Sequence, residues 1–225
     1  MEPIKKWLIR WSLYHARTST KVALRSIVDK KTVVFDLDET LIHCNENTNI
    51  PYDVKLPIVF PTGEIVEAGI NIRPHAVDIL KSLSKNFEVI VFTASHSCYA
   101  NVVLDHLDPH GEYIQHRLYR EHCYATSEGM YVKDLRVINR NLSDMVLIDN
   151  AAYSYAFQLE NGIPIIPYYE GRNDFELKAL QTYLESMLWA KDVRDINRNT
   201  FKLGKYRDHD DPDVLVQELY GEWIV

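Results

Sequence analysis

The chain of 225 residues has few of the residues that would mark a disulfide, zinc or nucleotide site. Its three cysteines, Cys44, Cys98 and Cys123, stand far apart, and no CxxC pair occurs. This usage predicts a reducing compartment, with neither a disulfide framework nor a zinc site. The eight glycines form neither GxGxxG nor GxxxxGK. The signatures of a dinucleotide-binding fold and of a P-loop are therefore both missing.

Long apolar runs are also absent. No stretch of 18 apolar residues occurs, which predicts that the chain has no transmembrane segment. The first residues lack the unbroken apolar core and the cleavage site of a secretory signal, so we expect an intracellular protein of the nucleus or cytoplasm. A mitochondrial location stays open as an alternative.

Positive charge is scarce outside the first 31 residues. These residues carry a net charge of +6, whereas the rest of the chain carries −13, for a total of −7. A body this acidic is unsuited to holding nucleic acid over a broad face, so we expect no direct nucleic-acid partner. With 46% hydrophobic residues, the chain can still form an ordinary core.

The two ends differ from the middle of the chain. Residues 1–30 form a basic amphipathic arm, with Trp7, Trp11 and Tyr14 at helical spacing. This arm is expected to pack on the body, or to bind a protein partner or a membrane surface; a mitochondrial presequence is a third interpretation. Residues 204–225 comprise an acidic linker and, over 214–225, an apolar tail that docks either on the body or on a partner.

Between the ends, residues 31–203 alternate between strand-like and helix-like patterns. Apolar runs predict five strands at 32–37, 87–92, 116–121, 144–149 and 162–167. Predicted helices follow Pro74, span about 97–107, and begin near Asn173. Strands separated by helices predict an α/β fold with a doubly wound, mainly parallel, five-stranded Rossmann-like sheet.

Three finer details of this fold are predicted. Val77, Leu80 and Leu83 are expected to form the buried face of the first helix. Asn173 and Glu176 suggest a capping box at the start of the last helix. The segment 51–72 is expected to form a small β-rich insertion, either a hairpin or a three-stranded flap.

Polar residues cluster where the predicted strands end. Asp36 and Asp38 follow the first strand, Thr93 follows the second, and Asp149-Asn150 end the fourth. In a doubly wound sheet ligands bind beyond the carboxyl ends of the strands, so these residues are expected to meet in one crevice. Two carboxylates there can divide the roles of nucleophile and proton carrier, and their oxygens suit Mg²⁺.

Each of these features also has a simpler interpretation when taken alone. Thr93 is the kind of residue that caps a helix, and Asp149-Asn150 is as consistent with a polar turn as with a site. Lys133, about ten residues before the fourth strand, would by itself be a surface lysine. In a shared crevice, however, it would neutralise a phosphoryl group held against Asp36.

Together these segments resemble a known family. The blocks "FDLDETL", "VFTAS", "YVKDL" and "LIDN" occur in the order seen in FCP/SCP-type phosphatases of the haloacid dehalogenase superfamily. "RPH" at 73–75 and "RLYREHC" at 117–123 look like the intervening blocks of the same family. That family acts on the C-terminal domain of RNA polymerase II and on other phosphoproteins, and the resemblance covers about residues 31–203.

The resemblance implies a role for each catalytic residue. Asp36 would attack phosphorus and form an aspartyl-phosphate. Asp38 would protonate the leaving oxygen of serine or threonine and then activate water. Thr93 and Lys133 would bind the phosphoryl oxygens.

It also implies a metal site. Mg²⁺ would be held by the Asp36 side chain, the Asp38 backbone carbonyl and Asn150, while Asp149 steadies its waters. Thr40 is expected to fix the Asp36 loop by hydrogen bonding.

The spacing of the motifs bears on the substrate. Only 57 positions separate Asp36 from Thr93, and 40 separate Thr93 from Lys133. Neither interval has room for a large cap domain of the kind that encloses small metabolites, so a phosphoprotein substrate is expected.

Four residues are candidates for contacts between the flap and the substrate: Glu46, Val59, His96 and Arg120. Glu46 stands where the polymerase-directed members have an aromatic residue, and His96 where they have leucine. The resemblance therefore transfers the phosphoserine and phosphothreonine chemistry, but not the polymerase-tail specificity. The alternatives are a binding or structural subunit, as in mitochondrial import, and a small-metabolite phosphatase.

Overall fold

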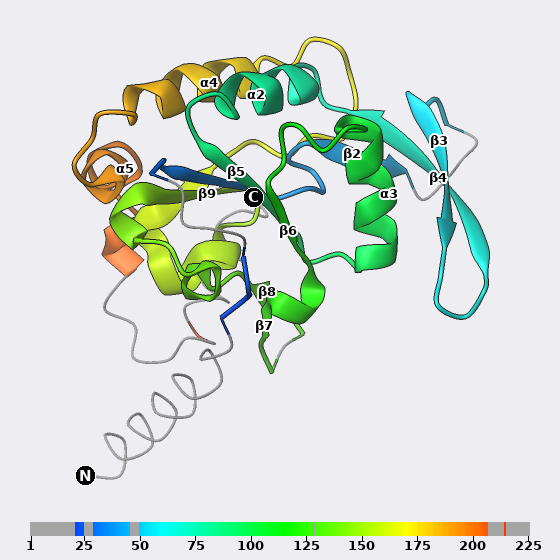
Figure 1. Cartoon of the computed structure of the whole chain (residues 1–225), viewed down its shortest axis with the longest axis horizontal. Helices are drawn as coiled ribbons and strands as arrows, with labels where there is room; N and C mark the ends of the chain where they lie inside the picture. Colours follow the sequence, from blue (N-terminus) through cyan, green and yellow to red (C-terminus); the bar gives the residue numbers. More distant parts are fainter. Residues whose placement is uncertain (1–20, 25–28, 46–49, 128, 207–213, 215–225) are drawn as a thin grey trace.

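The computed structural model describes residues 21–24, 29–45, 50–127, 129–206 and 214. Its centre is a parallel sheet with the strand order β10-β9-β1-β5-β6 (Figure 1). The strands are β1 (Thr32–Phe35), β5 (Glu88–Phe92), β6 (His116–Leu118), β9 (Met145–Asp149) and β10 (Gly162–Pro164). The predicted α/β sheet of five strands is confirmed, although three strands end earlier than predicted.

The central strand β1 shows why this sheet forms. Its residues are all buried, and the strand pairs in parallel with β5 on one side and β9 on the other. Val33 and Phe35 belong to one apolar cluster, whereas Val34 belongs to another. Because successive side chains of a strand point to opposite faces, one continuous apolar run supplies the core on both sides of the sheet.

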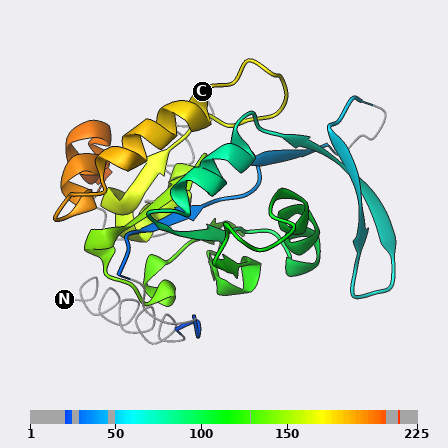
Figure 2. The same cartoon turned by 45° about the horizontal axis from the view of Figure 1, so that its top comes forward.

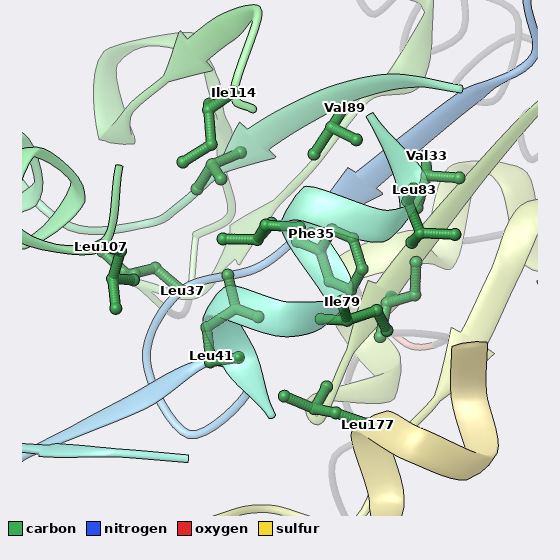
Figure 3. Packing of buried hydrophobic residues seen from close by; sticks show 14 of the residues in the cluster. Val33, Phe35, Leu37, Leu41, Ile79, Leu83, Val89, Leu107, Ile114 and Leu177 are labelled. Atoms are coloured by element: carbon green, nitrogen blue, oxygen red, sulfur yellow. The ribbon is translucent and has the colours of Figure 1, made fainter. Parts of the chain in front are cut away.

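Helices cover one face of the sheet. They are α2 (Ala76–Leu83), α3 (Ser97–Leu107), α4 (Glu176–Ser186) and α5 (Val193–Phe201). α2 and α4 lie side by side (Figure 2). Figure 3 shows Ile79 and Leu83 of α2 and Leu177 of α4 around Phe35 of β1. No helix among the described residues is both long and apolar enough to cross a membrane.

Short 3₁₀ helices contribute the packing on the other face. They are η2 (Leu135–Ile138), η4 (Ala152–Asn161) and η5 (Leu203–Tyr206). Two more, η1 (Arg120–His122) and η3 (Leu142–Asp144), lie in connections, and β7 (Tyr124–Ala125) pairs with β8 (Tyr131–Val132) in a small hairpin.

The insertion is a three-stranded antiparallel sheet with the order β2-β4-β3. Its strands are β2 (Ile42–Asn45), β3 (Val54–Val59) and β4 (Ile65–Ile72), so it begins at Ile42 and not at residue 51 as predicted. α3 packs against β3. The β3–β4 hairpin stands at the side of the molecule (Figures 1 and 2). Gly63, at φ 85°, lies in the turn between these strands.

Two predicted helix details are wrong. Val77 is 38% exposed, and Ala76 and Ile79 share the buried face with Leu80 and Leu83. His75 before the helix has a left-handed backbone, and the helix begins with Ala76 inward, which turns Val77 outward. The α4 helix has no capping box at Asn173, because the Asp174 carboxylate accepts from the Glu176 backbone N–H instead, at 3.1 Å.

Candidate active site

A cavity of about 700 Å³ lies at the carboxyl ends of β1, β5 and β9. Six of the predicted catalytic, phosphate-binding and metal residues line it: Asp36, Asp38, Thr93, Lys133, Asp149 and Asn150. The Asp36 backbone N–H donates to the Ile148 carbonyl at 2.9 Å, which extends the pairing of β1 and β9 to the edge of the cavity. The topology therefore brings residues from distant parts of the chain to one place, as parallel sheets do.

Lys133 is a buried charge of the site and not a surface lysine. Its ammonium donates to Asp36 Oδ1 at 2.5 Å and to Asp149 Oδ2 at 2.6 Å, and its side chain is 2% exposed. Its backbone N–H donates to the Ser154 carbonyl at 2.7 Å. Lysine is tolerated in such a place because two carboxylates compensate for the lost hydration.

The charges of this cluster affect one another. Burial raises the pKa of Asp36 to about 8; Lys133 opposes the rise, while Asp149 and Asp38 add to it. For Lys133, burial alone would lower the pKa, but Asp149 and Asp36 raise it overall. Lys133 is therefore a permanent cation. When both of its carboxylate partners are ionised, the buried trio has a net negative charge that a bound cation would neutralise.

Asp38 lies on the other side of the cavity and contacts hydroxyl groups. Its Oδ2 accepts from Ser95 Oγ at 2.7 Å, and its Oδ1 accepts from Tyr99 OH at 2.7 Å. The Thr93 hydroxyl lies 3.5 Å from Asp38 Oδ2, and accepts from the Ser95 backbone N–H at 2.9 Å. The simple capping interpretation of Thr93 fails, because His96 is the N-cap of α3 and makes no side-chain cap.

Thr40, expected to fix the Asp36 loop by hydrogen bonding, bonds to residues of two other segments. Its hydroxyl donates to Asn150 Oδ1 at 3.3 Å, and its carbonyl accepts from the buried Arg73 at 3.2 Å. The threonine thus connects the loop after β1 to the loop after β9. In that position it orients the amide of Asn150.

Of the flap candidates, Arg120 reaches the cavity. Its Nε donates to the Ala94 carbonyl at 2.6 Å, and its guanidinium lies over the Tyr131 ring at 4.9 Å. Its Nη1 is 3.0 Å from His96 Nε2. His96 and Val59, which is 55% exposed on β3, do not belong to the described residues that line the cavity. Glu46 lies outside the described residues.

Mg²⁺ fits the chemistry of the predicted ligands. The Asp36 carboxylate, the Asn150 amide and the Asp38 backbone carbonyl offer hard oxygen atoms, and Thr40 orients Asn150. Across the described ranges, no cluster of three or more His, Cys, Asp or Glu side chains could hold a metal. The predicted set is of another kind, with one carboxylate, one amide and one carbonyl, and a Mg²⁺ bound there would need water or substrate oxygens to complete its coordination.

Three residues of the site escaped the sequence analysis. Ser95 and Tyr99 contact Asp38, and Arg73 holds the Thr40 carbonyl. Ser95 lies in the "VFTAS" block and Arg73 in "RPH", so both were noticed without a role. Nothing in the local sequence indicates that Tyr99 contacts Asp38, because the two are 61 positions apart.

Comparison with known proteins places the chain among phosphatases. The family model "NLI interacting factor-like phosphatase" matches residues 31–194. CTD small phosphatase-like protein 3 of Caenorhabditis elegans is 43% identical over 179 residues, which cover 79% of this chain and 61% of that protein. CTD small phosphatase-like protein 2 of Dictyostelium discoideum is 42% identical, over 77% of this chain and 30% of that protein. The chain therefore spans less than two thirds of these relatives.

A further relative and a solved structure are also similar. CTD nuclear envelope phosphatase 1 of Xenopus laevis is 34% identical, over 76% of this chain and 72% of that protein. The structure of the fission yeast RNA polymerase II CTD phosphatase Fcp1 bound to beryllium fluoride aligns with a TM-score of 0.52 at 21% identity, over 87% of this chain and 63% of that one. This alignment shows that the fold is shared.

Proposed function

Because the chain belongs to the NLI interacting factor-like phosphatase family, we propose that it is a Mg²⁺-dependent phosphatase of phosphoserine and phosphothreonine in proteins. The main support from the site is the buried Lys133, which lies between Asp36 and Asp149 at the carboxyl ends of β1 and β9. A permanent cation beside an acidic side chain in a cavity is the arrangement that phosphoryl transfer to a carboxylate requires.

Asp36 is the proposed nucleophile. Its carboxylate attacks phosphorus, the bond from phosphorus to the serine or threonine oxygen breaks, and an aspartyl-phosphate forms. Asp38 gives a proton to the leaving oxygen. In the second step Asp38 takes a proton from water, the water oxygen bonds to phosphorus, and the bond to Asp36 breaks. Mg²⁺, when bound, offsets negative charge on the phosphoryl oxygens.

The other residues position the phosphoryl group for in-line attack. Lys133 and Thr93 bind phosphoryl oxygens, and Asn150, oriented by Thr40, contributes to the metal site. Asp149 keeps Lys133 in place at 2.6 Å. Its other oxygen accepts from the Ala151 backbone N–H at 2.8 Å.

The short intervals between the motifs support a protein substrate. Between Asp36 and Thr93 the described chain forms only the flap sheet, α2 and β5. Between Thr93 and Lys133 it forms α3, β6, η1 and the β7–β8 hairpin. Neither segment is a lid domain, so a phosphorylated side chain on a larger molecule can enter.

Location and partners are also proposals. A nuclear or cytoplasmic location agrees with relatives that are named for the nuclear envelope. Residues 1–30 and 214–225 are proposed to contact a partner, and no nucleic acid is proposed to bind directly. The complete set of motif residues disfavours the alternative of a purely binding subunit.

The proposed function is tested with Asp36→Asn. With Mg²⁺, the parent protein should hydrolyse phosphoserine peptides with higher kcat/KM than sugar phosphates, and EDTA should stop the reaction. Asp36→Asn should lower kcat at least about 1000-fold, and mass spectrometry should find a trapped phosphoryl group on the parent only. Asp78→Asn, an aspartate whose side chain is 79% exposed, is the matched control. Turnover by Asp36→Asn equal to that of the control would contradict the mechanism.

A further inference from the structure

Asp38 is held by two hydroxyl groups, one on each carboxylate oxygen. Ser95 Oγ lies 2.7 Å from Oδ2, and Tyr99 OH lies 2.7 Å from Oδ1. Both residues come from the segment that follows β5, where α3 begins. One donor on each oxygen fixes both the direction of the carboxylate and its rotation about the bond to Cβ.

Tyr99 is held by packing as well as by its hydrogen bond. The tyrosine packs against the apolar cluster beneath the helices, so its ring is anchored in the core. Burial, followed by the charge of Asp38, raises the pKa of its phenol far above the ordinary value. Tyr99 therefore keeps its proton and stays a donor to Asp38 Oδ1.

Ser95 is fixed through its backbone. Its N–H donates to Thr93 Oγ1 at 2.9 Å, and its carbonyl accepts from the Arg120 backbone N–H at 3.1 Å. These two bonds place the Ser95 hydroxyl at the wall of the cavity. A hydroxyl both donates and accepts, so Ser95 can serve Asp38 whether that side chain is ionised or protonated.

The two oxygens of Asp38 face different surroundings. Oδ2 is the oxygen 3.5 Å from the Thr93 hydroxyl, on the side where the phosphoryl group is proposed to bind, whereas Oδ1 is directed to Tyr99. The oxygen that exchanges a proton with the substrate is therefore Oδ2. Tyr99 anchors the opposite oxygen, and Ser95 sets the direction of the reactive one.

We propose that Ser95 and Tyr99 are positioning residues that aim Asp38 Oδ2 at the leaving oxygen of the substrate. This inference rests on the proposed function, in which Asp38 is the proton donor. A proton donor matters most when the leaving oxygen is strongly basic, as in an alkoxide of serine, and least when it leaves as a weakly basic phenolate. Loss of either hydroxyl should therefore lower kcat/KM most for the substrates whose leaving group is most basic.

The experiment compares kcat/KM for three substrates at saturating Mg²⁺: 4-nitrophenyl phosphate, phenyl phosphate and a phosphoserine peptide. Ser95→Ala and Tyr99→Phe are expected to lower kcat/KM about 10-fold to 100-fold on the phosphoserine peptide. On 4-nitrophenyl phosphate the loss should be below about 3-fold, with phenyl phosphate between the two. Ser95→Thr, which keeps a hydroxyl, should retain most of the activity on the peptide.

Matched controls remove hydroxyls of the same kind outside the site. In Tyr119→Phe the lost bond is to Asn101, and in Ser84→Ala it is to the Lys81 carbonyl; both variants should behave as the parent does. In the Asp38→Ala background, Tyr99→Phe should cause no further loss on the peptide, because there is no carboxylate left to position.

The outcomes distinguish the positioning role from the proposed function on which it rests. Equal losses on all three substrates, or no loss on the peptide, would overturn the positioning role while leaving the phosphatase intact. Absence of Mg²⁺-dependent turnover in the parent would instead contradict the proposed function. Circular dichroism of each variant identifies any loss of folding, and the two positions test the inference independently.

Discussion

At the scale of single residues, Gly162 shows how closely the core is packed. It begins β10, and a Cβ at this position would lie 2.3 Å from Cδ2 of Tyr155, a ring with no exposed surface. Its φ of −76° suits any residue, so space and not backbone conformation requires glycine here. The ring of Tyr155 cannot move without disturbing the cluster on that face of the sheet.

We therefore expect Gly162→Ala to lower the free energy of unfolding by about 1–3 kcal/mol. Gly204→Ala is the control, because the nearest atom to a Cβ there is Glu160 Oε1 at 3.7 Å, an ordinary contact distance. Urea unfolding followed by circular dichroism measures both. Equal stability of the two variants would show that the ring of Tyr155 yields easily.

The pKa of Asp36 leads to a second prediction at this scale, for protein kept in EDTA. The folded state holds a proton on Asp36 up to about pH 8, whereas the unfolded chain releases it near 3.8. The folded state thus binds more protons between these values, and the free energy of unfolding should fall as the pH rises.

Asp36→Asn removes this dependence. Between pH 5 and pH 8.5 the variant should become more stable relative to the parent by at least about 1 kcal/mol, since one pKa unit corresponds to about 1.4 kcal/mol. Unfolding curves in urea at both pH values measure the change, and Asp78→Asn should follow the parent. Parallel pH profiles for Asp36→Asn and the parent would show that Asp36 is ionised over the whole range.

At the scale of elements, the loop between β10 and α4 is fastened to the loop after β1. Arg73, 1% exposed, donates to the Asp174 carboxylate at 3.0 and 2.9 Å, to the Ile166 carbonyl at 2.8 Å and to the Thr40 carbonyl. The Tyr168 N–H donates to the Glu39 carbonyl at 2.8 Å. The shape of the catalytic loop thus depends on a segment more than 120 residues further along the chain.

Arg73→Lys should break this connection, because an ammonium cannot reproduce the planar fork of the guanidinium. We expect the free energy of unfolding to fall by about 2–4 kcal/mol, since a half-buried carboxylate and two carbonyls lose partners. Arg172→Lys is the control, since Arg172 is 83% exposed and pairs with Asp53; its loss should stay below about 1 kcal/mol. Similar thermal midpoints for the two variants would show that Arg73 is replaceable.

The elements also show which parts of the fold were open to sequence reasoning. The five strands and the strand-end carboxylates were predicted, because an apolar run that ends in acidic residues is a local signal. The start of the flap at Ile42 was missed, because β2 follows the "DLDET" turn without a break in pattern. Lys133 stood out only together with the other motifs, since its burial depends on Asp36 and Asp149, which lie at the ends of β1 and β9.

At the scale of the whole molecule, residues 21–24, which precede β1, contact the body of the fold. The Val22 N–H donates to the Val137 carbonyl at 3.0 Å, and Lys21 donates to Asn139 at 2.7 Å. Val22 and Leu24 pack against the cluster on the η4 face. The boundary at residue 30 stays a prediction, and residues 21–24 contact the body of the fold.

Deleting residues 1–20 should leave kcat/KM on 4-nitrophenyl phosphate within about 2-fold, because none of the described residues that line the cavity precedes Asp36. Deleting residues 1–28 should also lower the free energy of unfolding by about 1–2 kcal/mol, through the lost packing of Val22 and Leu24. Differential scanning calorimetry compares the two truncations. A loss of turnover in the shorter deletion, with folding intact, would assign the arm to the active site.

The central place of β1 has a consequence for how the protein is made. Thr32 pairs with Glu88 on one side and with Met145 on the other, so β1 waits for partners made 56 and 113 residues later. Such distant pairing slows folding. A nascent chain released before residue 145 would leave one edge of the apolar strand β1 open, which makes early termination products a source of aggregation.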